Sequence, residues 1–311
     1  MGGKELRGAG LMKILLFGKN GQVGWELQRS LAPLGELIAL DADSREMCGD
    51  FTDLDGLIRT IRAVAPDVIV NAAAHTAVDK AESEPELVRA INALAPAALA
   101  QEAKRCNAWL IHYSTDYVFD GSGEQPWRET DATAPLSVYG ATKLEGEQLI
   151  RQAACRHLIF RTSWVYGARG GNFAKTMLRL AQERDSLTVI NDQIGAPTGA
   201  DLLADVTAHA IRAARQQPEL SGLYHLVAAG ETSWHGYASF VLDYARRAGL
   251  ALKVAPDAIQ PVPSSAFPLP ARRPLNSRLD TAKLQSAFGL TLPVWQNGVV
   301  RMLAEVLDSG K

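Results

Sequence analysis

Short apolar runs alternate with segments of helical periodicity along most of the chain. Between the runs stand helical patterns such as WELQRSLAPL and the alanine-rich INALAPAALAQEAKR. Strands that are buried on both faces and separated by helices are typical of a doubly wound parallel sheet. The pattern therefore predicts an α/β fold. The expected strands are MKILLF (12–17), LIALD (37–41), DVIVNAAA (67–74), WLIHYST (109–115), HLIFRTS (157–163), LTVI (187–190) and LYHLVA (223–228).

Two segments depart from this alternation. The stretch PDAIQPVPSSAFPLPARRP (256–274) has no periodicity, and its prolines favour an extended loop. It lies too near the C-terminus to divide two equal domains, so we expect a loop over a cleft. Residues 1–11 precede Met12, where the interpretable pattern begins. We treat them as a leader or tag and leave them out of the fold.

Composition limits the kinds of partner. The 311 residues are 47% apolar, which suits one large domain or two interlocked ones. With a net charge of -2 and no cluster of basic residues beyond Arg272 and Arg273, a nucleic-acid or anionic-membrane surface is not expected. No apolar run reaches the roughly 20 residues that span a bilayer. The three cysteines are widely spaced and odd in number, which favours a reducing, cytoplasmic compartment.

Three glycines follow the first expected strand and open a helix. Gly18, Gly21 and Gly24 leave backbone amides free to hold a pyrophosphate, although a simple tight turn would also use glycine. Asp41 closes the second strand, where an acid can bind the ribose hydroxyls of a dinucleotide. Its carboxylate would repel a 2'-phosphate, but Arg45 lies close enough in sequence to offset that repulsion. NADH and NADPH therefore both fit this pattern.

A tyrosine and a lysine stand one helical turn apart in SVYGATKLEGE (137–147). Tyr139 and Lys143 project from the same face of a helix. The nearby ammonium is expected to lower the pKa of the phenol, so that the pair can exchange a proton with a carbonyl. The alternative is a surface tyrosine packed on a lysine stem. Catalysis is favoured because Ser114, Thr115 and Asp116 end the preceding strand.

Several motifs resemble the extended short-chain dehydrogenase/reductases that act on nucleotide sugars. They are Gly18-x-x-Gly21-x-x-Gly24, Asn71-Ala-Ala-Ala74, STDYVFDG (114–121) and Tyr139-Gly-Ala-Thr-Lys143. Longer blocks, from Met12 almost to the end, resemble the branch that reduces dTDP-bound 4-keto-6-deoxy sugars. These blocks are GQVGWEL, NAAAHTAVDKAE, HYSTDYVFDG, FRTSWVYG, NDQIGAPTG and PARRPLNSRLD.

The resemblance implies an architecture and a reaction. Residues 12–162 would form mainly a Rossmann-type dinucleotide-binding domain, and residues 163–311 mainly a smaller, interleaved nucleotide-sugar-binding region with segments returning to the first. A reduced nicotinamide would deliver hydride to the C4 carbonyl carbon. Tyr139 would protonate the carbonyl oxygen, Lys143 would tune the tyrosine and hold the nicotinamide ribose, and Thr115 would hydrogen-bond the carbonyl.

The same resemblance assigns binding residues. Asp116 and Trp164 would contact the sugar together with Thr115, although Trp164 as a packing residue is the alternative. Arg272 and Arg273 are assigned to the diphosphate because a guanidinium fork matches phosphate oxygens, with Asn172 as a neutral partner. The dinucleotide site would comprise Gly18, Gly21, Gln22, Val23, Gly24, Asp41, Asp50, Phe51, Ala74, His75, Thr76 and Tyr113, as well as Tyr139 and Lys143.

Other polar residues have plainer explanations. His112 and His225 lie within apolar strand patterns and are expected to be core histidines. Glu26, Asp201 and Glu305 match acidic positions that the family associates with a magnesium ion at a dimer contact. The resemblance is thus compatible with a homodimer, and any such ion would be structural, but ordinary solvated acids are the favoured interpretation of these three residues.

Two other functions fit the resemblance. A nucleotide-sugar epimerase or a fucose-type synthase shares the tyrosine–lysine chemistry but would keep its cofactor bound. A non-catalytic regulatory subunit of the same fold is the second alternative. The intact set of Thr115, Tyr139 and Lys143 disfavours it, since a chain kept only for binding has no need of all three.

Overall fold

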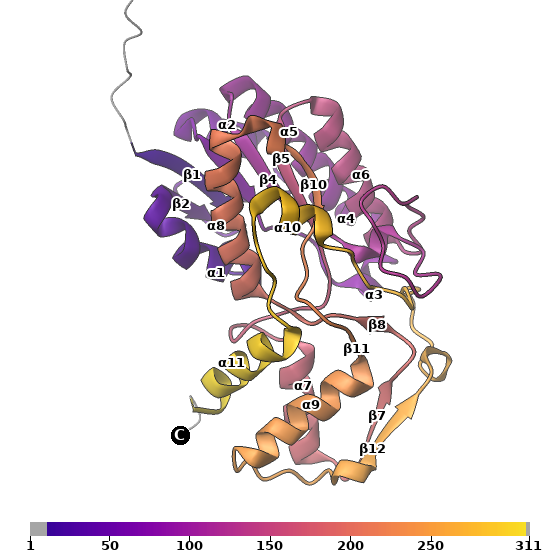
Figure 1. Cartoon of the computed structure of the whole chain (residues 1–311). Coiled ribbons are helices and arrows are strands. Elements are labelled where there is room, and N and C mark those ends of the chain that lie inside the picture. The colour runs from indigo at the N-terminus through magenta and orange to yellow at the C-terminus, as the bar shows by residue number, and fades with distance from the viewer. Residues whose placement is uncertain (1–10, 309–311) are drawn as a thin grey trace, which may run out of the picture.

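A six-stranded parallel sheet forms the centre of the molecule in the computed structural model, which describes residues 11–308 (Figure 1). The strand order is β10-β5-β4-β3-β1-β2, and each neighbouring pair is parallel. The predicted doubly wound sheet is thereby confirmed. Its strands are β1 (Met12–Phe17), β2 (Gly35–Leu40), β3 (Val68–Asn71), β4 (Trp109–Thr115), β5 (Arg156–Thr162) and β10 (Gly222–His225).

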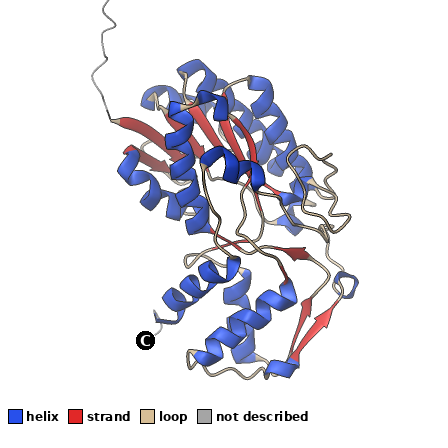
Figure 2. Ribbon diagram, viewed as in Figure 1, coloured by secondary structure: helices blue, strands red, loops and turns tan. Residues whose placement is uncertain are grey.

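Helices cover both faces of this sheet, as Figure 2 shows. Helices α1 (Gln22–Leu31), α8 (Ala200–Gln216) and α10 (Ala282–Phe288) pack on one face, and α2 (Leu54–Val64), α5 (Ala95–Cys106) and α6 (Val138–Ala153) on the other. Alternate strand residues supply the two cores: Ile14 and Leu16 belong to one cluster, Leu15 and Phe17 to the other. Burial on both faces explains why these strands appear in the sequence as continuous apolar runs.

A second body of helices lies beside the carboxyl ends of the strands (Figure 1). Helices α7 (Phe173–Glu183), α9 (Trp234–Arg247) and α11 (Trp295–Asp308) share a separate hydrophobic core. The strand predicted at 187–190 forms as β7 (Leu187–Ile190), but it pairs with β12 (Ile259–Val262) instead of joining the main sheet. The prediction of a loop over 256–274 is therefore wrong for four of its residues, because Ile259 is buried and the strand finds a distant partner.

Several shorter elements complete the fold. A π-helical segment, η2 (Ala90–Leu94), joins α4 (Pro85–Arg89) to α5. Within the part of the chain that the structure describes, no helix is both long enough and apolar enough to cross a membrane. The predicted leader, apart from Leu11, lies outside the described residues. The remaining elements are η1 (Ala32–Leu34), α3 (Val78–Ala81), η3 (Asp116–Val118), β6 (Val165–Tyr166), β8 (Ile194–Gly195), β9 (Thr198–Gly199), η4 (Pro218–Leu220), β11 (Thr232–Ser233), η5 (Pro256–Ala258) and η6 (Ser264–Ala266).

Candidate active site

A cleft of about 430 Å³ opens at the carboxyl ends of the sheet strands. Ligands of open α/β sheets bind at this edge, where the loops after the strands converge. The cleft brings together most of the residues predicted at the reaction centre. Its lining is Gly21, Gln22, Val23, Ala72, Ala74, Thr76, Val78, Tyr113, Ser114, Thr115, Asp116, Tyr117, Tyr139, Lys143, Thr162, Ser163, Trp164, Val165 and Trp234.

The glycine turn between β1 and α1 forms one end of the cleft. Gly18 has φ of 83°, and a side chain there would collide with the backbone of Ala72 and Ala73. A side chain on Gly24 would collide with the carbonyl of Gly18. At Gly21 the nearest atom to an added Cβ lies 3.4 Å away, so the protein itself does not fill this space. The absence of a side chain on Gly21 therefore leaves room for a ligand. Two glycines thus build the turn, and one keeps it open.

Besides Gly18 and Gly24, four residues assigned to the dinucleotide lie outside the cleft lining. Asp41 accepts hydrogen bonds from the amides of Asn20 (3.0 Å) and Ala42 (2.8 Å), which fixes the end of β2 beside the turn. Asp50 accepts from the amide and hydroxyl of Thr52. Phe51 is 4% exposed and packs edge-to-face on Phe17, so it is a core residue. His75 is held through its amide by the Asn92 side chain at 2.9 Å.

The predicted catalytic residues meet at the centre of the cleft. Helix α6 begins after Ser137, whose hydroxyl accepts from the amide of Gly140 at 3.2 Å, and this cap sets Tyr139 in the first turn. Thr115 ends β4 and shares a hydrogen bond with the phenol of Tyr139. The ring of Tyr117 packs edge-to-face on that of Tyr139, with centroids 5.5 Å apart. Lys143 is only 2% exposed, which excludes the alternative of a surface pair.

The expected lowering of the tyrosine pKa is not found. Burial raises the pKa of Tyr139 to about 12, although its hydrogen bond to Thr115 acts in the opposite direction. Burial likewise lowers the pKa of Lys143 to about 8, against the influence of Glu147. The physical reason is that desolvation penalises the charged form of each group. The phenol therefore keeps its proton near neutrality, and it can act as a donor.

Lys143 is anchored by the strand beneath it. Its Nζ donates to the carbonyl of Tyr113 at 2.6 Å and lies 3.2 Å from Nε2 of His112. The phenol of Tyr113 lies 2.6 Å from the hydroxyl of Thr207, so its side chain is turned towards α8. His112 and His225 are 1% and 0% exposed, which confirms that both are core histidines.

Two stacked indoles also line the cleft. Trp164 follows β5 with φ of 49°, an unusual conformation for a bulky residue. Its ring lies 3.7 Å from that of Trp234, almost parallel to it, and Trp234 donates to Gln193 at 3.0 Å. The sequence analysis missed Trp234, since it lies in no motif and reaches the cleft from the distant helix α9.

Polar groups line the floor between the two ends. Asp116 is 2% exposed, and burial raises the pKa of its carboxyl to about 6. Its carboxyl accepts from the Thr115 hydroxyl at 3.1 Å and is also hydrogen-bonded by Ser277. The buried hydroxyls of Thr162 and Ser163 have no hydrogen-bond partner within residues 11–308. Unsatisfied buried groups of this kind suit the hydroxyls of a polar ligand.

The residues assigned to the diphosphate do not line this cleft. Arg273 forms a two-pronged ion pair with Asp79, with distances of 3.0 and 2.7 Å, and Arg272 is exposed. Asn172 caps α7 by accepting from the amide of Lys175, and its amide group donates to Gly167 and Gln22. Both Arg273 and Asn172 are thus satisfied by protein partners, which the sequence pattern did not indicate.

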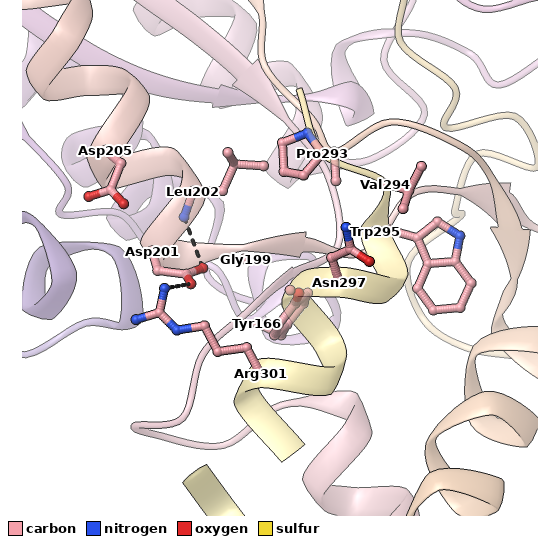
Figure 3. Close-up of a pocket in the computed structure, with 12 residues that line it drawn as sticks. Tyr166, Gly199, Asp201, Leu202, Asp205, Pro293, Val294, Trp295, Asn297 and Arg301 are labelled. Atoms are coloured by element: carbon pink, nitrogen blue, oxygen red, sulfur yellow. Dashed lines mark hydrogen bonds and ion pairs between the residues drawn. The ribbon is translucent and has the colours of Figure 1, made fainter. Parts of the chain in front are cut away.

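The three acids assigned to a metal line one small hollow, but an arginine occupies it with them. Arg301 pairs with Asp201 at 3.4 Å (Figure 3). It also pairs with Glu305, at 3.4 Å. Glu26 pairs with Arg29 at 3.3 Å. Within residues 11–308, no three His, Cys, Asp or Glu side chains lie close enough together to hold a metal ion. The guanidinium of Arg301 thus balances the charge of two of these acids, and the magnesium site stays a prediction.

The parallel sheet, the glycine turn and the tyrosine–lysine pair in the cleft are those of a Rossmann-fold oxidoreductase that uses a nicotinamide dinucleotide. Comparison with known proteins refines this class. The chain belongs to the family described as the RmlD substrate binding domain, which matches residues 12–308.

Relatives and solved structures agree with this assignment. The dTDP-4-dehydrorhamnose reductases of Salmonella typhimurium and Escherichia coli K12 are 63% and 62% identical to it, over 96% of this chain and 99% of each relative. The dTDP-4-dehydrorhamnose reductase from Bacillus anthracis, solved in complex with NADP, is 32% identical with a TM-score of 0.86, over 95% of this chain and 99% of that one. The reductase from Clostridium acetobutylicum is 36% identical with a TM-score of 0.85, over 95% of this chain and 100% of that one.

Proposed function

We propose that this protein reduces the C4 carbonyl of dTDP-4-dehydro-6-deoxy-L-mannose with NADPH or NADH and so forms dTDP-L-rhamnose, the last step of dTDP-L-rhamnose biosynthesis. The observation that carries the proposal is the convergence of Tyr139 with the buried Lys143 and Thr115 in one cleft, which is also lined by a dinucleotide-type glycine turn and by two indoles. Reductases of this name that are more than 60% identical over nearly the whole chain support the choice of substrate.

Tyr139, Thr115 and Lys143 each have a different role in carbonyl reduction. A bound nicotinamide supplies hydride to the carbonyl carbon. Tyr139 donates a proton to the developing alkoxide, because the raised pKa of the phenol keeps that proton in place near neutral pH. Thr115 orients the phenol and the carbonyl oxygen. Lys143, fixed on the Tyr113 carbonyl, lies one turn further along α6 and holds the nicotinamide ribose.

The two ends of the cleft receive the two substrates. The amides of the turn around Gly21 hold the dinucleotide pyrophosphate, and Gln22, Val23, Ala74 and Thr76 line that end. The sugar lies between the indole of Trp164 and the carboxyl of Asp116. Residues 12–162 therefore form mainly the dinucleotide-binding domain, while residues 163–311 supply mainly the nucleotide-sugar side and return α8, β10 and α10 to the sheet.

Assembly and location are further parts of the proposal. Exposed apolar side chains on α1 and α11, such as Trp25 at 45% and Val300 at 36%, suit a homodimer contact. The cysteines are all free, which suits the cytoplasm. Light scattering on the purified chain and fractionation of the producing cells test these two points.

The decisive experiment supplies verified dTDP-4-keto-6-deoxy-L-sugar and NADPH and follows both nicotinamide absorbance and product identity. Oxidation of NADPH with formation of dTDP-L-rhamnose is expected. Intact substrate with no NADPH consumed would show that the reductase assignment is wrong. A tightly retained cofactor with isomerised sugar would show an epimerase instead.

Replacing the proton donor is the matching mutational test. Tyr139→Phe is expected to lower kcat about 10²- to 10⁴-fold, the usual contribution of one acid–base group. NADPH affinity should change little. Tyr224→Phe is the control, because that phenol only donates to the Leu220 carbonyl in the sheet core. If Tyr139→Phe turned over at the parent rate, Tyr139 would not be the acid.

A further inference from the structure

Three buried polar side chains form a line behind the reaction centre. Asn71 ends β3, His112 lies in β4, and Lys143 comes from α6. The exposed fractions of these side chains are 1%, 1% and 2%. Asn71 Nδ2 lies 3.0 Å from His112 Nδ1, and His112 Nε2 lies 3.2 Å from Lys143 Nζ. Only the last of the three residues lines the cleft.

The direction of these hydrogen bonds is set by a backbone amide. The amide of Ala73 donates to Oδ1 of Asn71 at 3.0 Å, so the side-chain NH₂ of Asn71 must point at His112. Nδ1 of His112 then accepts, and a neutral imidazole that accepts at Nδ1 carries its hydrogen on Nε2. A flipped amide would set two donors against each other at Ala73. The line therefore presents an N–H to Lys143.

An N–H facing Nζ bonds to a neutral amine and opposes an ammonium. The other groups around Lys143 do little to reverse this preference. The carboxylate that acts on Lys143, that of Glu147, is fully buried, and it accepts two bonds from Arg161 (2.9 and 2.7 Å) and one from Ser114 (2.5 Å). The other acceptor for Nζ is the Tyr113 carbonyl. His157, which influences His112 electrostatically, itself remains neutral because burial lowers its pKa.

We propose that Asn71 and His112 are positioning residues that act through Lys143. They hold the tautomer of His112 whose Nε2–H faces Nζ, and they thereby favour transfer of the lysine proton to the phenolate that Tyr139 becomes when it protonates the alkoxide. Lys143 alternates between an ammonium bonded to the Tyr113 carbonyl and an amine that also accepts from His112. The inference rests on the proposed function, since it assigns to the reductase a control of its lysine.

The tautomer can be read directly in the full chain. Histidine labelled with ¹³C and ¹⁵N gives distinct ring shifts for the two neutral tautomers, and loss of one signal in His112→Gln identifies His112. The Nε2–H form is expected from pH 6 to 9. Detection of the Nδ1–H form or of an imidazolium in the parent protein would overturn the proposal, and this measurement needs no activity.

Asn71→Asp is a nearly isosteric change that should reverse the donor and acceptor roles of the hydrogen bonds from residue 71 through His112 to Lys143. The new carboxylate still accepts from Ala73 but also accepts from His112, so the imidazole hydrogen moves to Nδ1 and Nε2 becomes an acceptor for the ammonium. The alkaline fall in kcat, expected near pH 8 in the parent protein, should move upwards by about one pH unit or more. The ¹³Cε titration of labelled Lys143 should move with it.

Three comparisons make the test decisive. His225→Gln removes another buried histidine, whose Nδ1 lies 3.0 Å from the Trp127 carbonyl. This variant should leave the pH of the alkaline fall in kcat unchanged. A reversed tautomer in Asn71→Asp without any shift of the Lys143 titration would overturn the proposal. If that variant did not fold, the tautomer of His112 measured in the parent protein would decide whether the proposal holds. Failure of the parent protein to reduce the sugar would refute the proposed function, yet the lysine titration would still test the inference.

Discussion

Both ends of the cleft contain a residue in the left-handed region, but they are of opposite kinds. Gly18 has φ of 83° at the dinucleotide end, where the backbone of Ala72 and Ala73 leaves no room for a side chain. Trp164 has φ of 49° at the sugar end, although its large side chain disfavours that conformation. The glycine is dictated by packing. The tryptophan is held against its preference, which costs of the order of 1–3 kcal/mol.

Gly18 is thus required by the structure, whereas the conformation of Trp164 is explained by function. At Gly18 the protein itself fills the space, so the residue would be required without any ligand. At Trp164 the strain is offset by the stack on Trp234 and directs an indole into the cleft. Strained residues of this type gather where a ligand must be met. Substitution of Trp164 should therefore impair function with little loss of stability, whereas substitution of Gly18 should impair both.

The largest expected effect is at the dinucleotide end. Gly18→Ala should lower the free energy of unfolding by about 2–6 kcal/mol, because left-handed strain and a backbone collision add together. Chemical denaturation measures the loss. Gly171→Ala is the control, since an added Cβ there meets nothing within 4 Å. Equal stability of the two variants would contradict the packing role of Gly18.

Gly21→Ala sharpens the same comparison. An added Cβ lies 3.4 Å from its nearest neighbour, so the free energy of unfolding should fall by less than about 1 kcal/mol. The methyl group would nevertheless project where the dinucleotide pyrophosphate approaches. NADPH affinity, measured by fluorescence titration, should therefore weaken about tenfold or more. Unchanged affinity would place the pyrophosphate elsewhere.

An intermediate effect is expected at the sugar end. Trp164→Ala should raise KM for the dTDP-sugar about tenfold, equivalent to about 1.4 kcal/mol, and leave NADPH affinity within about twofold. Trp164→Gly removes the same ring but accommodates φ of 49°, so it should be about 1 kcal/mol more stable than the alanine variant. If the glycine variant were the less stable of the two, Trp164 would not store strain.

The parts of the molecule that sequence predicted are those fixed by neighbours along the chain. Burial of β1 on both faces gives an apolar run, and one helical turn between Tyr139 and Lys143 places both on the cleft. The order Gly18, Gly21, Gly24 marks the turn because each glycine meets a local steric limit or leaves space for a ligand. Such features need no knowledge of distant segments.

The features that sequence missed depend on segments that meet only after folding. β12 contains Pro261 and has no periodicity, yet it forms because β7 offers a parallel partner. Trp234 reaches Trp164 through the packing of α9. The sign of the change in the pKa of Tyr139 was also wrong, since the spacing to Lys143 indicates proximity but not the burial that dominates. A local sequence pattern does not indicate which distant strands will pair or how strongly a side chain will be desolvated.

The smallest expected effect concerns the ion pair at the rim of the sugar end. Arg273 is joined to Asp79 across 194 residues, and the same guanidinium hydrogen-bonds Tyr117, which lines the cleft. Asp79→Asn removes a negative charge beside the expected path of an anionic substrate. KM for the dTDP-sugar should fall about two- to threefold at low salt, and the gain should shrink at high salt because the charges are screened.

Stability should change little in that variant. The side chain of Asp79 is 38% exposed, and partly solvated pairs contribute less than about 1 kcal/mol. Asp243→Asn is the matched control, because it breaks an exposed pair with Arg246 on α9 (3.1 Å) while removing the same charge. A rise in KM confined to Asp79→Asn would mean that the carboxylate positions Arg273 for the diphosphate instead of competing for it. The sugar end would then be organised in advance by side chains, as the dinucleotide end is by its backbone.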